Sequence, residues 1–415
     1  MQTQPDSHAY AHAYDHYRDL LATLATDEIP LDVLREVGKQ CGWWQPCRTW
    51  QRTYGRFHLG ATPLVTLIYE TIDAPQEICV IHVQQTFPAI FTPGQALFRR
   101  NRVGWLSLTR FPADPHLPTL RSVLARPYHA KVVRYRPGKR CTIRCPAPAG
   151  DAPIAPMFDL PCFAKVFADD EGAAIHHESL ALWVASQTGV IGFAVARPLA
   201  WQGELRTLWQ GVVPGAPIMT RLLSAEGPAL AERLGRAAAS LTQSGLQPQQ
   251  VTDGRKQQKR SVKYAERLRA FFPALAPALD FLLEKLAVVH AERDQTRLRP
   301  IHGAPHAHQW LDDGERLGLV DFDGFALGDP ELDAATFLAE MEFEDWETVP
   351  VAAINHRFQT GYEAVAGPLE PRLLNAYRAH KRLSKALRNA YAVRADNDMR
   401  VERALGQAII AALQT

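Results

Sequence analysis

The sequence predicts an α+β protein of more than one domain, with strands concentrated in its first half and helices in its second. Runs rich in β-branched and aromatic residues occupy residues 64–69, 78–83 and 131–145. After about residue 215 the apolar residues recur three and four positions apart, which is typical of amphipathic helices. At 415 residues the chain is too long for one ordinary core, so two to three domains are expected.

The composition is that of a soluble globular protein, with 47% hydrophobic and 22% charged residues. The net charge of +2 gives no support for a nucleic-acid or anionic-membrane partner. The start of the chain has no basic, apolar leader pattern, and nowhere do eighteen apolar residues run together. The six cysteines form no C-x-x-C pair, which favours reduced thiols in a cytoplasmic protein.

Residues 8–37 have the pattern of two helices. Pro30 is expected to open the second helix and Gly38 to close it. The first helix places three leucines on one face: Leu20, Leu21 and Leu24. Together with the strands that follow, these helices predict an N-terminal α+β unit over residues 1–118.

Three histidines in the first helix, His8, His12 and His16, are spaced so that they share one face. Such a series raises the question of a metal site. Because no carboxylate or cysteine motif accompanies it, we interpret it as a solvated histidine face and predict no metal there.

Residues 131–145 read as a hairpin of two alternating strands around Gly138. The basic residues Lys139 and Arg140 follow the turn and fit either a phosphate contact or an ordinary solvated turn. The next strand, residues 161–167, places Lys165 among apolar neighbours, where a lysine is costly unless it is paired.

A helix over residues 172–186 offers a partner for Lys165 in Glu178; the alternative is a mere surface pair. Its packed face is expected to carry Leu180, Trp183 and Val184. Further helices are expected from residue 229 onward. Between them, the basic run at residues 255–260 is interpreted as an exposed connector that either attracts an anionic substrate or is simply solvated.

Residues 299–341 read as loop, strand, turn, strand, loop and helix. The turn signal Asp312-Asp313-Gly314 predicts a hairpin whose arms are residues 310–311 and 317–322. Such a hairpin brings polar residues that are distant in sequence into one small volume. They are His302, Gly303, His306, Gln309, Asp321 and Asp323.

The same stretch carries His302-Gly303, His306, Val320-Asp321-Phe322-Asp323, Gly328-Asp329-Pro330 and Asp333. This pattern resembles the aminoglycoside phosphotransferase and choline kinase families, which carry H-G-D-x-H-x-x-N-x-L, then I-D-F-D or I-D-W-E, then G-D-P-x-x-D. The resemblance implies a two-lobed protein-kinase-like fold. A β-rich N-lobe with its hinge would span residues 119–214 and a helical C-lobe residues 215–415, preceded by the unit at residues 1–118 as a cap.

The resemblance also implies ATP and Mg²⁺ as cofactors and a small-molecule hydroxyl acceptor, and it implies a role for each matching residue. Asp321 would be the principal metal ligand, with Gln309 and Asp323 beside it, and His302 would pack under the loop and fix it. Asp329 would cap the following helix, and Asp333 would bond loop amides. The remaining residues would bind the nucleotide. Lys165 would contact its phosphates and Glu178 would orient Lys165, while Lys139 would lie near the phosphates. The backbone of Gln210 to Val212 would hydrogen-bond the adenine edge.

Two positions depart from the family pattern. Gln309 replaces the metal-binding asparagine but keeps a carbonyl oxygen, whereas Ala304 replaces the catalytic aspartate and can neither accept a proton nor orient a hydroxyl. Ala304 fits a deliberate substitution, a natural pseudo-kinase, or an active enzyme that uses another base, such as the flanking His306 or His308.

The predicted function is therefore an ATP-dependent phosphotransferase acting on a sugar, aminoglycoside or amino alcohol and impaired by Ala304. The alternative is an inactive nucleotide-binding pseudo-kinase with a regulatory role. No nucleic-acid or membrane partner is expected. The sequence names neither the acceptor nor the oligomeric state.

Overall fold

The computed structural model describes residues 7–59, 62–73, 76–88, 95–125, 130–146, 161–293, 297–343 and 351–415, with side chains from residue 16 onward. The chain forms two compact units, each described here by itself. The first comprises Met1–Asp170, Gln202–Thr207 and Arg388–Arg400, and the second comprises Glu171–Trp201, Leu208–Leu387 and Val401–Thr415. Within the described residues, no helix is both long and apolar enough to span a membrane. The limits predicted at residues 118 and 214 stay predictions.

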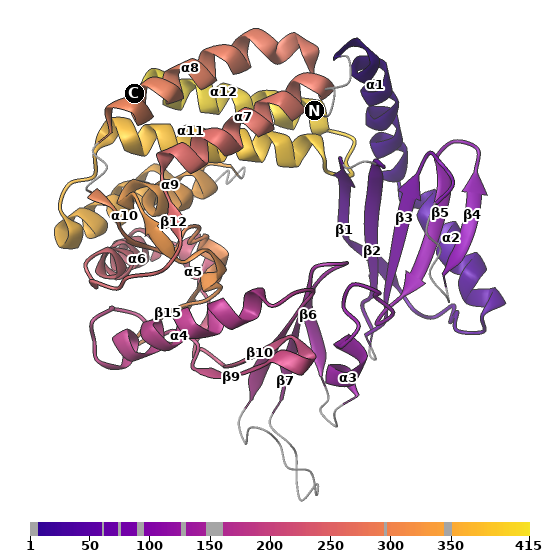
Figure 1. The fold of residues 1–415 in the computed structure, drawn as a ribbon, viewed down its shortest axis with the longest axis horizontal. Coiled ribbons are helices and arrows are strands. Elements are labelled where there is room, and N and C mark those ends of the chain that lie inside the picture. Colours follow the sequence, from indigo (N-terminus) through magenta and orange to yellow (C-terminus); the bar gives the residue numbers. More distant parts are fainter. Residues whose placement is uncertain are drawn as a thin grey trace, which may run out of the picture. The chain divides into compact units, whose positions relative to one another are not determined.

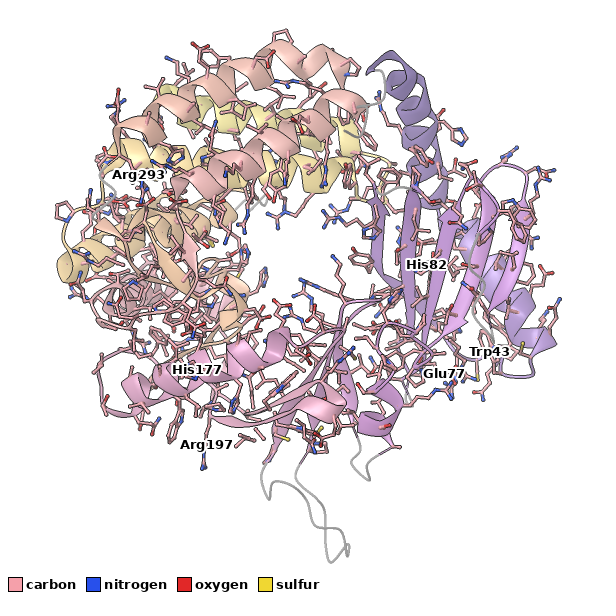
Figure 2. The ribbon with its side chains drawn as sticks, viewed as in Figure 1. Trp43, Glu77, His82, His177, Arg197 and Arg293 are labelled. Carbon is pink, nitrogen blue, oxygen red and sulfur yellow. The ribbon has the colours of Figure 1, made fainter. Side chains whose placement is uncertain are left out.

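The first unit contains an antiparallel sheet of five strands in the order β1-β2-β3-β5-β4 (Figure 1). Its strands are β1 (Trp50–His58), β2 (Leu64–Thr71), β3 (Ile78–Gln84), β4 (Ala96–Arg100) and β5 (Gly104–Arg110). The strands predicted at residues 64–69 and 78–83 are β2 and β3, so both predictions are confirmed. Arg110 at the end of β5 forms an ion pair with Glu77 at 3.2 Å, and its guanidinium lies over the Trp43 ring at 5.3 Å; Figure 2 labels Trp43 and Glu77.

The predicted N-terminal helices are present as α1 (Ser7–Leu24) and α2 (Glu28–Gln40). The leucine face is buried, with exposures of 2% or less: Leu20, Leu21 and Leu24. The expectation that Gly38 closes α2 is wrong, because the helix continues to Gln40. Gly38 instead lies under the next turn, where its carbonyl accepts the N–H groups of Trp43 and Trp44, each at 2.9 Å. A β-carbon at residue 38 would lie 2.9 Å from Trp43. The side chains of His8 and His12 lie outside the described residues.

The first unit also contains α3 (Leu120–Leu124), the short helix η1 (Gly203–Leu205) and three antiparallel strands. The strands are β6 (Lys131–Arg136), β7 (Arg140–Cys145) and β8 (Cys162–Phe167), which confirms the predicted hairpin and the strand that follows it. A segment near the C-terminus completes this unit. Tyr391 accepts the Phe57 N–H at 2.8 Å, and the two rings pack edge to face at 5.3 Å.

The second unit opens with α4 (Glu171–Gln187), followed by the neighbouring strands β9 (Pro198–Gln202) and β10 (Thr207–Gly211), each with one terminal residue in the first unit. The helix was predicted, and the prediction that Leu180, Trp183 and Val184 form its packed face is wrong. Leu180 and Val184 are 43% and 53% exposed, whereas the opposite face, with Ile175, Leu182 and Ala185, is buried. Both faces of this helix are apolar, so hydrophobic periodicity does not distinguish them.

The helical part of the second unit begins with α5 (Met219–Leu222), α6 (Gly227–Thr242), α7 (Gly254–Phe271), η2 (Pro273–Leu275) and α8 (Ala276–Glu292). The basic run at residues 255–260 lies inside α7, so its interpretation as a connector is wrong. Asp253 explains the early start, because its side chain caps the helix by accepting the Lys256 N–H at 3.0 Å. In Figure 1, α7 and α8 lie side by side as an antiparallel pair.

Two small sheets carry the stretch that the sequence marks as functional. One has the order β11-β14-β15, and the other has the order β12-β16-β13. Their strands are β11 (Ala216–Pro217), β12 (Val251–Thr252), β13 (Arg299–Ile301), β14 (Trp310–Asp312), β15 (Leu317–Leu319) and β16 (Ala326–Gly328). Trp310 pairs with Leu319, which confirms the predicted hairpin. Its second arm ends before the predicted limit, because residues 322–324 form a short 3₁₀ helix, η5 (Phe322–Gly324).

Four long helices follow, as predicted: α9 (Pro330–Met341), α10 (Val351–Ala366), α11 (Pro371–Ala390) and α12 (Asn397–Leu413). Phe337 of α9 stacks on Phe358 of α10 with ring centroids 4.1 Å apart. Helices α6 and α10 pack backbone to backbone, since a β-carbon on Gly361 would lie 2.1 Å from the Glu232 carbonyl oxygen. This core holds α9, and with it the predicted site, in place.

Candidate active site

The loop after β13 is held from beneath by a histidine, as predicted. His302 is 1% exposed, and its Nε2 atom lies 3.1 Å from the carbonyl oxygen of Val320. Its ring also packs on Phe322 at 4.5 Å. These contacts tie the loop after β13 to the segment after β15, which carries Asp321.

The carboxylate of Asp333 fixes the same loop through its backbone. One oxygen accepts the N–H of His302 at 2.6 Å and the other accepts the N–H of Gly303 at 2.8 Å, so the predicted role is confirmed. Asp333 is 4% exposed, and burial raises its pKa to about 6 although the two hydrogen bonds act to lower it.

Gly303 allows this loop to approach its neighbour closely. Its φ is +87°, a conformation that residues with a β-carbon rarely adopt. A β-carbon there would lie only 2.4 Å from the carbonyl oxygen of Gly324 in η5. The loop and η5 are therefore in backbone contact.

The structure brings two of the predicted metal-binding residues together. The Gln309 Nε2 atom lies 3.3 Å from Oδ2 of Asp321, and Asp323 follows in η5, half-buried. The side-chain amide oxygen of Gln309, Oε1, accepts the His306 N–H at 2.7 Å in a capping box. The nitrogen of the Gln309 amide, and not its oxygen, therefore faces Asp321.

The backbone of Asp321 is in a strained conformation. Its φ of 72° and ψ of 52° lie in the left-handed region, which costs a residue other than glycine about 1 kcal/mol or more. Such outliers persist where the surrounding structure enforces them and cluster at functional sites. Here the hydrogen bond from His302 fixes Val320, the residue that immediately precedes Asp321.

Ala304 brings no polar side chain to the loop, and its carbonyl accepts the His306 N–H at 2.9 Å. His306 is itself engaged by Glu340 of α9, whose Oε2 lies 3.5 Å from His306 Nδ1 and accepts the Ala307 N–H at 2.6 Å. Burial acts to raise the pKa of Glu340, but these contacts outweigh it and lower the pKa. Sequence reasoning missed Glu340, although it lies seven residues after Asp333 and so on the same helix face.

The expectation that Asp329 caps the following helix is wrong. Asp329 occupies the N-cap position of α9, but its side chain makes no capping hydrogen bond. The carboxylate instead accepts hydrogen bonds from Nε and Nη2 of Arg293, at 2.9 and 2.7 Å, and from the hydroxyl of Tyr377. Arg293 and Asp329 are both almost fully buried, and a buried charge of this kind requires a partner (Figure 2).

Two of the predicted nucleotide-binding residues lie in the first unit. Lys165 is half-buried on β8, between the buried residues Ala164 and Val166. Lys139 lies in the turn between β6 and β7, where its N–H donates to the Arg136 carbonyl at 3.0 Å. Asp114, which sequence reasoning missed, accepts the Gly138 N–H of this turn at 2.8 Å.

The other predicted nucleotide-binding residues lie in the second unit. Glu178 on α4 accepts the backbone N–H of Gln249 at 2.9 Å. Gln210 lies near the end of β10, and Val212, just beyond it, is 40% exposed. Between them, the Gly211 N–H donates to the Arg197 carbonyl at 2.8 Å. Because Lys165 and Glu178 lie in different units, their ion pair stays a prediction.

Among the described residues, no group of three or more His, Cys, Asp or Glu side chains is arranged to hold a metal ion. Magnesium needs no such group, because it is commonly bound by one or two carboxylates together with substrate phosphates and water. The half-buried carboxylate of Asp321, with Asp323 two residues on, fits that requirement.

Comparisons with known proteins identify a family that this chain matches. A model of the "Phosphotransferase enzyme family" matches residues 164–374 of the 415-residue chain. A search of curated proteins returned no match.

Solved structures similar to this chain include two choline kinases and an aminoglycoside phosphotransferase. Choline kinase LicA from Streptococcus pneumoniae is 12% identical, with 69% of this chain and 94% of that chain covered and a TM-score of 0.47. The GDP complex of aminoglycoside 2'-phosphotransferase-IIIa is 14% identical, with 68% and 92% covered and a TM-score of 0.45. Choline kinase from Cryptosporidium parvum is 10% identical, with 67% and 88% covered and a TM-score of 0.47.

Proposed function

Because this chain belongs to the phosphotransferase enzyme family, we propose that it transfers the γ-phosphoryl group of ATP to a hydroxyl of a small molecule. The acceptor class is a sugar, an aminoglycoside or an amino alcohol. The observation that carries the proposal is the intact loop scaffold, in which Asp333 accepts the N–H groups of His302 and Gly303. That scaffold holds the loop next to Asp321.

Phosphoryl transfer depends mainly on positioning and on neutralising charge, and little covalent help from the protein is needed. Mg²⁺, when bound, supplies that neutralisation on the phosphate oxygens. Asp321 is the residue that would hold it, with Gln309 and Asp323 beside it. Gln309 would first have to turn its amide, since its carbonyl oxygen accepts the His306 N–H.

The remaining residues position the nucleotide. Lys165 would contact the α- and β-phosphates, and Glu178 would orient it. Lys139 would approach the phosphates from the turn between β6 and β7. The backbone around Gln210 and Val212 would meet the adenine edge, and the Gly211 N–H, which is bonded to Arg197, would not take part.

Ala304 sets the rate in this proposal. General-base catalysis typically contributes about 10²- to 10⁴-fold, so its absence leaves a slow enzyme and not a silent one. His306 does not replace the missing base without leaving Glu340, whose carboxylate lies 3.5 Å from its Nδ1 atom.

A second candidate function is nucleotide binding without turnover, as in a pseudo-kinase. Two observations favour it: Ala304 lacks a base, and the Gln309 amide nitrogen donates to Asp321, the carboxylate proposed to hold the metal. Both functions require the nucleotide to bind, and only the first yields a phosphorylated product.

The test combines calorimetry with a product assay. ATP is titrated with and without Mg²⁺ into the wild-type chain and into Asp321→Ala, and phosphorylated product is followed over panels of sugars, aminoglycosides and amino alcohols. We expect affinity that depends on Mg²⁺ in the wild type only, with slow product formation. Binding without product would favour the pseudo-kinase, and ATP affinity unchanged by Asp321→Ala would contradict both.

A further inference from the structure

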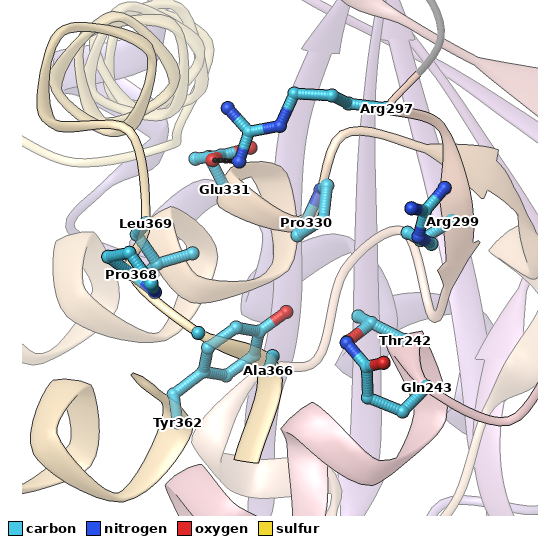
Figure 3. A pocket seen from close by; sticks show the side chains of 11 residues that line it. Thr242, Gln243, Arg297, Arg299, Pro330, Glu331, Tyr362, Ala366, Pro368 and Leu369 are labelled. Atoms are coloured by element: carbon cyan, nitrogen blue, oxygen red, sulfur yellow. Dashed lines mark hydrogen bonds and ion pairs between the residues drawn. The ribbon is translucent and has the colours of Figure 1, made fainter. Parts of the chain in front are cut away.

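A cavity lies in the second unit, outside the residues assigned to phosphoryl transfer. Its volume is about 290 Å³, and it is lined by the end of α6, the start of β13, the start of α9 and the connection from α10 to α11 (Figure 3). This volume corresponds to about ten water molecules. The cavity therefore suits a small molecule and not a nucleotide.

A buried hydroxyl group points into this cavity without a partner. Tyr362 of α10 is 0% exposed, and the neighbouring Thr242 hydroxyl acts to lower the pKa of Tyr362. That hydroxyl donates to the Ala239 carbonyl at 2.8 Å, and the Tyr362 Oη atom has no hydrogen-bond partner of normal geometry within the described residues. Figure 3 shows the hydroxyl directed into the space between the lining residues. Burial raises the pKa of Tyr362, so the group remains a hydrogen-bond donor at neutral pH. A buried donor normally has a partner, and here a ligand oxygen would supply it.

The charges around the cavity favour an anion. Arg299 opens β13. Within the described part of the chain, the only hydrogen bond of its side chain goes to the Leu298 carbonyl, at 3.0 Å, and no carboxylate contacts it. Arg297 lies 3.5 Å from the buried carboxylate of Glu331, which also accepts the Glu370 N–H at 3.0 Å. Two guanidinium groups against one carboxylate leave the lining with one positive charge in excess.

We propose that this cavity binds a small molecule carrying a phosphate or carboxylate group, distinct from the nucleotide and from the phosphoryl acceptor. Arg299 pairs with the oxyanion, and the Tyr362 hydroxyl donates to a second oxygen of the ligand. Guanidinium groups are well suited to either oxyanion.

The cavity adjoins both elements that hold the proposed catalytic loop. Arg299 precedes His302 by three residues, and Glu331 precedes Asp333 by two. Arg299 is also paired with Gly328, at the end of the strand that follows η5. A ligand in the cavity would therefore bind at the base of β13 and α9 without touching Asp321 or Ala304.

The test is calorimetric titration of the full chain with three probes: inorganic phosphate, glycerol 3-phosphate and, as the uncharged comparison, glycerol. We expect saturable binding of the anions only. Arg299→Gln should weaken it about tenfold or more, because a charged hydrogen bond is lost. Tyr362→Phe should lower the affinity for glycerol 3-phosphate by roughly threefold to tenfold, because only a neutral hydrogen bond is lost.

Matched controls separate this site from the nucleotide site. Arg267→Gln removes one exposed charge from α7, and Asp321→Ala changes the proposed metal site; both should leave the affinity for the anions unchanged. Circular dichroism establishes that each variant is folded. The proposal is overturned if no anion binds saturably, if glycerol binds as tightly as glycerol 3-phosphate, if Arg299→Gln and Tyr362→Phe bind like the wild type, or if ATP displaces the anion competitively.

Discussion

In the proposed function, Ala304 occupies the point in the loop where a carboxylate would orient the acceptor hydroxyl and receive its proton. The loop around it is held by Asp333, whose carboxylate accepts the N–H groups of His302 and Gly303. Glu340 holds His306 at the same time. At the scale of single residues, we therefore propose that the site lacks one functional group, the general base, while the backbone that would hold it is in place.

The first prediction concerns a carboxylate placed at position 304. Ala304→Asp should raise the rate of phosphoryl transfer by about 10²- to 10⁴-fold, because it supplies the general base. The measurement is phosphorylated product over the same acceptor panel. Ala304→Asn is the matched control, since it has a similar size but accepts no proton at neutral pH. Equal rates for the two variants, with ATP still bound, would favour the regulatory function.

Gly303 gives a second prediction at this scale. Gly303→Ala should destabilise the protein by roughly 1–3 kcal/mol, because its φ of +87° is unfavourable for alanine and the new β-carbon would lie 2.4 Å from Gly324 O. Denaturant unfolding measures this change. Gly406→Ala in α12 is the control: nothing lies within 4 Å of its β-carbon, so helix propensity should stabilise it by about 0.5–1 kcal/mol. A stabilised Gly303→Ala would mean that the loop does not contact η5 as described.

Three helices of the second unit meet at a buried pair of histidines. Nε2 of His290 on α8 lies 2.7 Å from Nε2 of His380 on α11, and the His380 Nδ1 atom lies 2.5 Å from the Ser261 hydroxyl on α7. Burial lowers the pKa of His290 to about 4, with Arg293 acting in the same direction, and burial lowers the pKa of His380 as well. Both histidines are therefore neutral in the folded protein at pH 7.

This pair predicts a loss of stability in acid. Between pH 6.5 and about 4 the unfolded chain binds protons that the folded His290 does not, so stability falls as the pH falls through that window. From pH 6.5 to 5 the loss from His290 should be about 2 kcal/mol, and His380 should add a loss in the same direction. Urea unfolding at pH 7 and pH 5 of the wild type and of the double variant His290→Gln, His380→Gln measures it. The double variant should be less dependent on pH, and the exposed His308→Gln should behave like the wild type. An unchanged dependence in the double variant would place the acid sensitivity at other groups. Asp333 is not one of them, because its raised pKa makes stability rise as the pH falls through about 6.

Most of these elements could be predicted from the sequence, because local patterns define them. The hairpin of β14 and β15 follows from its Asp-Asp-Gly turn, and the four C-terminal helices follow from their periodicity. The packed face of α4 and the partner of Asp329 could not be predicted. The face depends on which of two apolar sides meets the core, and Asp329 pairs with Arg293, 36 residues earlier. Tertiary contacts decide both.

At the scale of the whole molecule, the chain returns to its first unit near its end. Arg388–Arg400 belongs to that unit, although the helices on either side belong to the second. Tyr391 is 3% exposed and packs on Phe57 of β1, and the Val393 N–H donates to the Gly55 carbonyl at 3.2 Å. The first compact unit therefore contains segments that are distant from one another in the sequence. Sequence patterns report neighbours along the chain and carry no information on such a return.

The last prediction tests whether the two units unfold separately. Tyr391→Ala should cost about 3–5 kcal/mol, the range for removing a large buried aromatic side chain. Because its partner Phe57 lies on β1, hydrogen exchange should accelerate in β1 and β2 while α9 keeps its protection. Met399→Ala, at a position that is 65% exposed in the same segment, is the matched control and should change neither. Equal loss of protection in β1 and α9 would instead mean that the units unfold as one cooperative structure. In that case the N-terminal unit would contribute directly to the stability of the loop that carries Ala304.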